Sequence, residues 1–301
     1  MPNIKNAKAA IPIVLIAGIF WSFGPYVVRH IDQKHLVTWQ YLFTRGVVIF
    51  CLLNIYLFLV EGLAFYKNYF KIGFSGLVGG IGLGTAMITF IWSISNTTAA
   101  VTLLCLAAMP FMTALLGFLF LRERILLTVW IAILVAAFGI VVMASGNTQE
   151  NTFMGLVFGL ISAFGFSIFS VSLRWRKETP KFTTVAIAGL FCFLFSSIMM
   201  LINETSFLAS GKNEALFATH GTLVCLGLIL YSIGSKNIPA ADLTLLSLTE
   251  VIGGIFWVWL PWLGINEAPS TNTIICGFFI FIAIFYYSLI MQTNRRFIGL
   301  N

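Results

Sequence analysis

Residues 98–121, TAAVTLLCLAAMPFMTALLGFLFL, form a stretch of 24 residues without a charged side chain. A helix rises about 1.5 Å per residue, so this stretch is long enough to cross a hydrocarbon core of about 30 Å. Backbone amides cannot be left unpaired in lipid, and the stretch lacks the polar-apolar alternation of a membrane barrel strand. It therefore predicts a transmembrane helix.

Similar stretches recur along the chain. Hydrophobic residues make up 59% of the 301 residues and charged residues 9%, whereas a soluble domain carries roughly 25% charged residues. The composition excludes a soluble protein and predicts an all-α membrane protein. We place ten transmembrane helices at 10–29, 36–60, 70–93, 98–121, 126–145, 152–173, 183–203, 216–235, 241–262 and 270–292.

The basic residues are distributed unevenly between the two sides of the predicted membrane. Thirteen of the 17 fall on the side that holds both termini: Lys5, Lys8, Lys67, Lys71, Arg122, Arg124, Arg174, Arg176, Lys177, Lys181, Lys236, Arg295 and Arg296. Arg29, Lys34 and Lys212 fall on the other side, and Arg45 lies within the membrane. Because cytoplasmic loops are rich in Lys and Arg, both termini are expected in the cytoplasm. The net charge of +7 then requires no nucleic-acid partner.

Two short sequence echoes predict an internal repeat. WSFG at 21–24 is echoed by SAFG at 162–165, and NTTAA at 96–100 by NIPAA at 237–241, both at an offset of 141 residues. The repeat divides the chain into five-helix units at 1–147 and 148–301. Since five is odd, the second unit enters the membrane from the opposite face. Inverted repeats of this kind commonly build alternating-access transporters with a site near the midplane.

Residues 110–125, PFMTALLGFLFLRERI, resemble the fourth-helix motif of the drug/metabolite transporter superfamily, EamA type. Ten helices, a duplicated EamA-like half and Leu248-Thr249-Glu250 extend the resemblance over essentially the whole chain. Two positions depart from the pattern: Arg122-Glu123 replaces the usual Gly-Glu, and Glu250-Val251 the usual Glu-Pro.

This resemblance implies a gradient-driven exporter or exchanger of small metabolites such as amino acids, in a bacterial inner membrane. Related eukaryotic members move nucleotide sugars and triose phosphates, so that solute class stands as the alternative. The expected partners are a small-molecule substrate, protons and membrane lipid. The oligomeric state is open between monomer and homodimer.

Glu250 is a candidate site for a proton or a substrate. It lies nine residues after the start of the predicted helix 241–262, about 14 Å deep by helical rise. A charge at the centre of a helix in the bilayer costs roughly 2.5–3.5 kcal/mol, so the side chain should face the bundle interior. Two interpretations stay open: a proton carrier or ligand for a cationic group, and a hydrogen bond that holds the helix.

Arg45 lies equally deep in the predicted helix 36–60 and cannot readily lose its proton. Its guanidinium suits a substrate carboxylate or phosphate. Two alternatives would satisfy the guanidinium equally well. It could donate to helix carbonyls, or the side chain could extend past Gln40 and Tyr41 to the outer membrane surface.

Five aromatic residues are candidates for the wall of a solute cavity: Trp21, Phe23, Tyr26, Trp92 and Tyr231. Anchoring at the membrane interface is the alternative, since Trp and Tyr collect there. Only Trp21 lies deep enough to favour the cavity.

Two prolines are candidates for helix bends, because proline removes a backbone hydrogen bond. They are Pro25 in the first predicted helix and Pro110 in the fourth. Pro110 is the stronger candidate because it lies near the middle of the membrane.

Enzyme and channel functions find little support. Gly73-Phe74-Ser75-Gly76 matches the short GxSG pattern of rhomboid-type proteases, but a nucleophilic serine needs a nearby base. His30, His35 and His220 are all placed at outward helix ends, far from Ser75. The sequence has no phosphate loop, no zinc motif and no closely spaced pair of cysteines, so we expect neither a cofactor nor a bound metal. A channel would need rings of charge or carbonyls, whereas the charges here are isolated.

Overall fold

The computed structural model describes residues 7–33, 36–122, 127–145, 153–176, 178–236 and 238–297. Several residues named above lie outside these ranges: Lys5, Lys34, His35, Glu123, Arg124, Lys177 and Asn237. The side chains of Lys8, Arg295 and Arg296 are likewise outside the described part.

Within these ranges the fold is entirely helical, which confirms the predicted fold class. The elements are α1 (Ala7–Arg29), α2 (Thr38–Glu61), η1 (Gly62–Tyr66), α3 (Lys67–Phe70), α4 (Gly73–Asn96), α5 (Ala99–Leu106), α6 (Met109–Leu121), α7 (Leu127–Ala144), α8 (Phe153–Trp175), α9 (Lys181–Ile202), α10 (Gly211–Gly234), α11 (Ala240–Leu246), α12 (Thr249–Trp259), η2 (Pro261–Leu263) and α13 (Thr271–Phe297). Eight apolar helical segments are long enough to cross a membrane, and Trp130–Ala144 and Thr271–Tyr286 are shorter apolar helices. The described residues thus contain the ten apolar segments that the sequence predicts.

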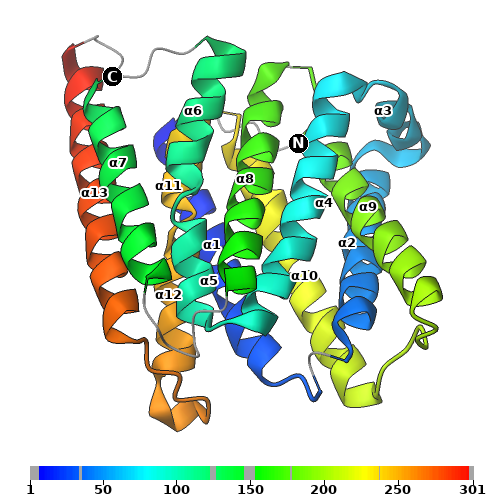
Figure 1. The fold of residues 1–301 in the computed structure, drawn as a ribbon. Coiled ribbons are helices and arrows are strands. Elements are labelled where there is room, and N and C mark those ends of the chain that lie inside the picture. Colours follow the sequence, from blue (N-terminus) through cyan, green and yellow to red (C-terminus); the bar gives the residue numbers. More distant parts are fainter. Residues whose placement is uncertain are drawn as a thin grey trace.

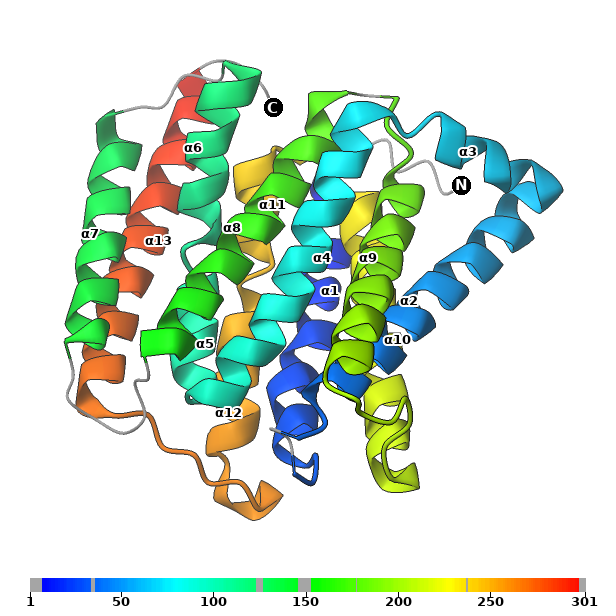
Figure 2. The ribbon, with the colours of Figure 1, turned by 45° about the vertical axis from the view of Figure 1, so that its right-hand side comes forward.

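The long helices run side by side in one bundle, so that most of their ends gather at two opposite ends of the molecule (Figure 1). The helix α1 begins and α13 ends at the same end, which also carries α3 and the last turns of α6 and α8 (Figures 1 and 2). We call it the basic end, because Lys67, Lys71, Arg122 and Arg174 lie there. Arg29 and the start of α5 lie at the opposite end.

Two predicted helices, 98–121 and 241–262, were wrong in one respect, because each is broken in the middle. The first divides into α5 and α6 around Ala107 and Ala108, and the second into α11 and α12 around Ser247 and Leu248. Hydropathy could not predict the breaks, since both halves of each helix are apolar. The helices α6 and α11 pack together, as do α5 and α12, so the two breaks lie beside each other inside the bundle.

The two proline candidates behave differently. Pro110 stands in the first turn of α6, immediately after the break, where its missing N–H would have had no helical partner. The helix α1 continues through Pro25.

The start of α10 also differs from the prediction. The helix begins at Gly211 rather than at residue 216, and the Ser210 hydroxyl caps it by accepting a hydrogen bond from the Asn213 N–H. Lys212, Asn213 and Glu214 look like a loop in the sequence, but the first turn of a helix tolerates polar residues. This extension places His220 well inside the helix, so its predicted position at a helix end was wrong.

Candidate functional site

A cavity lies in the centre of the bundle, beside the two helix breaks. We call it the central cavity, and its lining residues are Trp21, Arg45, Leu83, Ala86, Met87, Phe90, Leu106, Met109, Ser162, Phe166, His220, Val224, Leu228 and Glu250. The volume open to the centres of water-sized molecules is about 60 Å³. A single water needs roughly 10–15 Å³ by this measure, so the cavity has room for a few waters.

Arg45 enters the central cavity from α2. The next residue, Gly46, presses the backbone of α2 against α9, because a Cβ there would lie 2.6 Å from the Phe193 nitrogen. The arginine is only 5% exposed. Its Nε and Nη1 atoms are buried and have no hydrogen-bond partner in the described structure. Helix carbonyls therefore do not satisfy these two atoms, and an anion in the cavity would.

Glu250 enters the same cavity from the first turn of α12, directly after the second break. Its backbone N–H donates to the Ser247 carbonyl at 2.9 Å. Among the described residues its carboxylate makes no hydrogen bond and no ion pair within 4 Å, and Arg45 in the same cavity is its electrostatic partner. The structure therefore shows no hydrogen bond by which this carboxylate would hold the helix, and the carboxylate faces the space that a ligand would occupy.

His220 is a cavity residue that the sequence interpretation missed. The ring is 1% exposed, and its Nδ1 is hydrogen-bonded to the hydroxyl of Tyr41 on α2. Gly24 of α1 leaves space for the ring, since a Cβ there would lie 2.7 Å from the His220 Nε2. A histidine within an apolar helix was the available signal, but the misplaced start of α10 concealed it.

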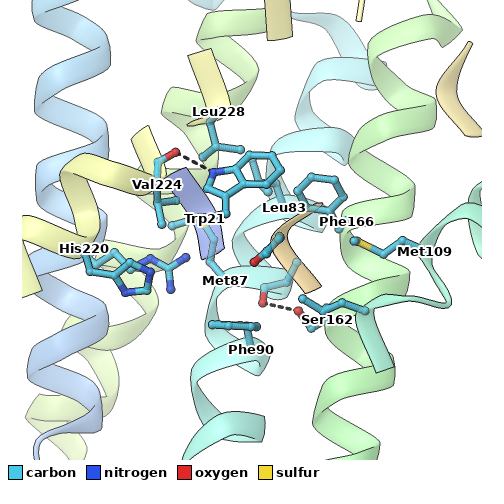
Figure 3. A pocket seen from close by; sticks show the side chains of 14 residues that line it. Trp21, Leu83, Met87, Phe90, Met109, Ser162, Phe166, His220, Val224 and Leu228 are labelled. Atoms are coloured by element: carbon cyan, nitrogen blue, oxygen red, sulfur yellow. Dashed lines mark hydrogen bonds between the residues drawn. The ribbon is translucent and has the colours of Figure 1, made fainter. Parts of the chain in front are cut away.

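Trp21 lies on the cavity wall, as the sequence suggests (Figure 3). Its indole N–H donates to the Val224 carbonyl at 3.2 Å. The ring contacts Phe166 and Tyr231 with centroids 5.6 and 5.5 Å away. Tyr231 is fully buried behind Trp21, and its hydroxyl lies 2.7 Å from the Ser170 hydroxyl. Together with Phe169, these rings form what we call the aromatic layer: Trp21, Phe166, Phe169 and Tyr231.

The remaining aromatic candidates lie away from the central cavity. Phe23 stacks on Trp257 with ring centroids 4.9 Å apart. Tyr26 packs on His30 within its own helix. Trp92 contacts Trp39 and lines a separate, mostly apolar pocket between α2, α4, α8 and α9. The structure therefore does not bring these three residues together with Arg45 and Glu250.

Ser162 occupies the position in the second half that corresponds to Trp21 at the offset of 141 residues. Its hydroxyl donates to the Ala86 carbonyl of α4 at 2.9 Å, much as Trp21 donates to α10. The correspondence is what two related halves would produce, while the division at residue 147 stays a prediction.

An ion pair lies at the end of the bundle opposite the basic end. Arg29 Nε and Glu267 Oε2 are 2.5 Å apart, and Arg29 Nη2 donates to Glu267 Oε1 at 3.2 Å. Glu267 also accepts a hydrogen bond from the Ala99 N–H. This Arg29–Glu267 network connects α1, the start of α5 and the segment before α13.

The short GxSG pattern does not assemble a catalytic site. Ser75 is hydrogen-bonded to the Thr179 hydroxyl at 2.7 Å, whereas His30 follows the end of α1 and His220 lies within α10. The described residues contain no group of three or more His, Cys, Asp or Glu side chains placed to hold a metal ion.

Comparison with known proteins agrees with this architecture. Residues 8–145 match the EamA-like transporter family. Protein RarD of Escherichia coli K12 is 22% identical over 308 residues, which cover 98% of this chain and 99% of RarD. The family match and the transporter names of these relatives support membership of the drug/metabolite transporter superfamily.

Other proteins that match this chain also carry transporter names. An uncharacterized transporter of Helicobacter pylori J99 is 22% identical over 89% of this chain and 92% of its own length. The pseudopaline exporter CntI of Pseudomonas aeruginosa PAO1 is 24% identical over 69% of this chain and 72% of CntI. A crystal structure superimposes with a TM-score of 0.66, covering 95% of this chain and 98% of its own, and at 19% identity it shows a shared fold. The protein is thus an integral membrane transporter of this superfamily.

Proposed function

We propose that this protein is a secondary active exporter or exchanger of a small zwitterionic metabolite of the amino-acid type, working by alternating access. The observation that carries the proposal is a pair of opposite charges that line one cavity, Arg45 and Glu250, with two buried guanidinium nitrogens of Arg45 left without a hydrogen bond in the described structure. A zwitterion would satisfy both, with its carboxylate on the guanidinium and its ammonium on the glutamate. A buried guanidinium nitrogen without a hydrogen bond is costly, so a ligand oxygen that accepts from Arg45 would be stabilised there.

The size of the central cavity favours a small solute over a nucleotide sugar. About 60 Å³ for water centres accommodates a few waters, and the wall between Phe90, Phe166 and Trp21 is apolar. An amino acid requires only a modest widening, whereas a nucleotide sugar would require the helices to separate extensively.

Packed side chains lie toward both ends of the bundle from this cavity, where alternating access would need gates. The aromatic layer covers the cavity toward the basic end. The Arg29–Glu267 network joins three segments at the opposite end. Discontinuous helices that meet at the site, here α5–α6 and α11–α12, are a recurrent feature of such transporters.

The proposal places the basic end in the cytoplasm and the protein in a bacterial inner membrane. The excess of Lys and Arg at this end supports the orientation. Protons are the proposed coupling ion, with Glu250 as their carrier.

The test is flux of radiolabelled amino acids in proteoliposomes, compared with protein-free liposomes. Saturable uptake with counterflow is expected from a carrier, and flux that never saturates would indicate a channel. N-acetyl and methyl-ester analogues each remove one charge of the zwitterion. A charged hydrogen bond contributes roughly 1.5–3 kcal/mol, so each analogue should be transported about tenfold or more weakly.

Two variants assign the charges to their partners. In Glu250→Gln, transport should no longer prefer the free amino acid over its N-acetyl analogue. In Arg45→Gln, transport should no longer prefer the free amino acid over its methyl ester. Preferences that are unchanged in both variants would reject the central cavity as the substrate site, even if transport itself is observed.

A further inference from the structure

A second cavity opens at the basic end, and we call it the basic cleft. It lies between the ends of α8 and α10 and the starts of α9 and α11. Its lining residues are Leu173, Arg174, Thr179, Pro180, Lys181, Phe182, Ser235, Lys236, Ile238 and Pro239. Its volume for water-sized molecules is about 700 Å³, more than tenfold that of the central cavity.

All charged side chains that line this cleft are cationic: Arg174, Lys181 and Lys236. The Lys181 Nζ donates to the Ser235 hydroxyl at 2.8 Å, which points the ammonium at the cleft wall. Two acidic residues are close to lining residues in the chain without lining the cleft themselves: Glu178 beside Thr179, and Asp242 in the first turn of α11. A cleft lined by one sign of charge focuses the field and concentrates counter-ions. The basic cleft therefore attracts anions.

About two turns of α8 separate the basic cleft from the central cavity. Phe166, Ser170 and Arg174 follow one another at intervals of four residues, so they share one face of the helix. Phe166 lines the central cavity and Arg174 lines the cleft. Ser170 lies between them and is hydrogen-bonded to Tyr231.

The helix α10 repeats this order on the other side of the path. Leu228 lines the central cavity, Tyr231 belongs to the aromatic layer, and Ser235 lines the cleft. These residues are three and four positions apart, again on one face. The Ser170–Tyr231 hydrogen bond thus joins the two helices between the cavities, and only the aromatic layer divides them.

We propose that the basic cleft is the solvent-open mouth of the transport path, and that it takes up solutes through an anionic carboxylate or phosphate group. This inference rests on the proposed function and adds a first binding site before the central one. Arg174 suits the fork of an oxyanion, and the two lysines supply charge without fixed geometry.

The test uses Pro180→Cys as a reporter in the purified, reconstituted protein, because Pro180 lines the cleft and is partly exposed, whereas Ser235 is only 3% exposed. The thiol is treated with a sulfonate-bearing and with a trimethylammonium-bearing methanethiosulfonate, and the ratio of the two rates is measured. The ratio cancels differences in thiol reactivity and reports the local field. Lys181→Gln combined with Lys236→Gln should lower the preference for the anionic reagent about fivefold or more.

Lys67→Gln is the matched control, because it removes a positive charge at the same end but outside the cleft. It should leave the ratio nearly unchanged. The unsubstituted protein gives the background from its own cysteines, of which Cys51 is exposed. Pro239→Cys is a second, partly exposed reporter on another part of the lining, for use if Pro180→Cys folds poorly.

No reaction of either reporter would overturn the mouth, since a solvent-open cleft must admit the reagents. An equal fall in the ratio with Lys67→Gln would overturn the cleft as the source of the field. Labelling requires no transported solute, so the two proposals fail separately. Charge-selective labelling without solute flux would reject transport alone, and saturable flux with unselective labelling would reject the cleft alone.

Discussion

The two helix breaks share a backbone arrangement but differ in chemistry. The break between α5 and α6 is followed by Pro110 and places only the apolar Leu106 and Met109 in the central cavity. The break between α11 and α12 has no proline and places Glu250 there. Pro110 and Glu250 each occupy the second position of the helix that follows. One break thus supplies a neutral wall to the cavity, and the other supplies the negative charge.

The reasons for the two breaks also differ. Pro110 cannot donate the backbone hydrogen bond that would continue α5 into α6. At the second break, the Ser247 hydroxyl donates to the Thr244 carbonyl at 2.8 Å. The Thr249 hydroxyl lies 3.3 Å from the carbonyls of Leu15 and Leu246. Hydroxyls that bond to nearby carbonyls compete with regular helix. Similar backbones are therefore reached through ring geometry in one half and through hydroxyl hydrogen bonds in the other.

The largest effect is expected from Glu250→Gln, which makes the second break as neutral as the first. Proton-linked transport in proteoliposomes should fall by at least about tenfold, because the proton carrier is lost. Expression and helix content by circular dichroism should be spared. Unchanged pH-dependent flux would rule out Glu250 as the carrier and leave both breaks purely structural.

Arg45→Lys tests the cation that faces the charged break across the cavity. Lysine keeps the charge but loses the planar fork, so transport of an anionic or zwitterionic solute should weaken about fivefold. Transport of a neutral solute should change little. Equal losses for both solutes would indicate a folding defect.

Glu267→Gln tests the connection between the two broken helices, since Glu267 follows the second and accepts a hydrogen bond from Ala99 at the start of the first. The amide keeps an acceptor for Ala99 but loses the ion pair with Arg29. A partly exposed ion pair contributes about 1 kcal/mol or less, so the opposite end should open up to about fivefold more often. Labelling of a Thr97→Cys reporter should accelerate accordingly. Arg29→Gln is the matched partner, and acceleration by only one of the two variants would argue against a shared ion pair.

Pro110→Ala should have the smallest effect, because it only makes the first break proline-free like the second. Ala107 and Ala108 already carry the turn, so we expect transport to change by less than about twofold and the melting temperature by a few degrees at most. A large loss would mean that proline alone maintains this break, and that the two halves differ more in mechanism than in chemistry.

Much of the candidate site was visible in the sequence because charges are rare in apolar segments. Glu250 and Arg45 stand out for that reason, and Trp21 stands out by its depth. His220 did not, since its position depends on where α10 begins. Phe23 and Trp92 looked equivalent to Trp21, yet they face other helices, because rotation of a helix about its axis cannot be inferred from hydropathy.

The sequence alone determined that the chain crosses the membrane as helices, their approximate bounds and the end at which the basic residues collect. These properties depend on local length and composition measured against the bilayer. Only the tertiary structure decided that two helices break, that Arg45, Glu250 and His220 share a cavity, and that a basic cleft lies about two helical turns beyond it. Those features arise from contacts between residues far apart in the chain, such as Trp21 with Val224, which no local pattern encodes.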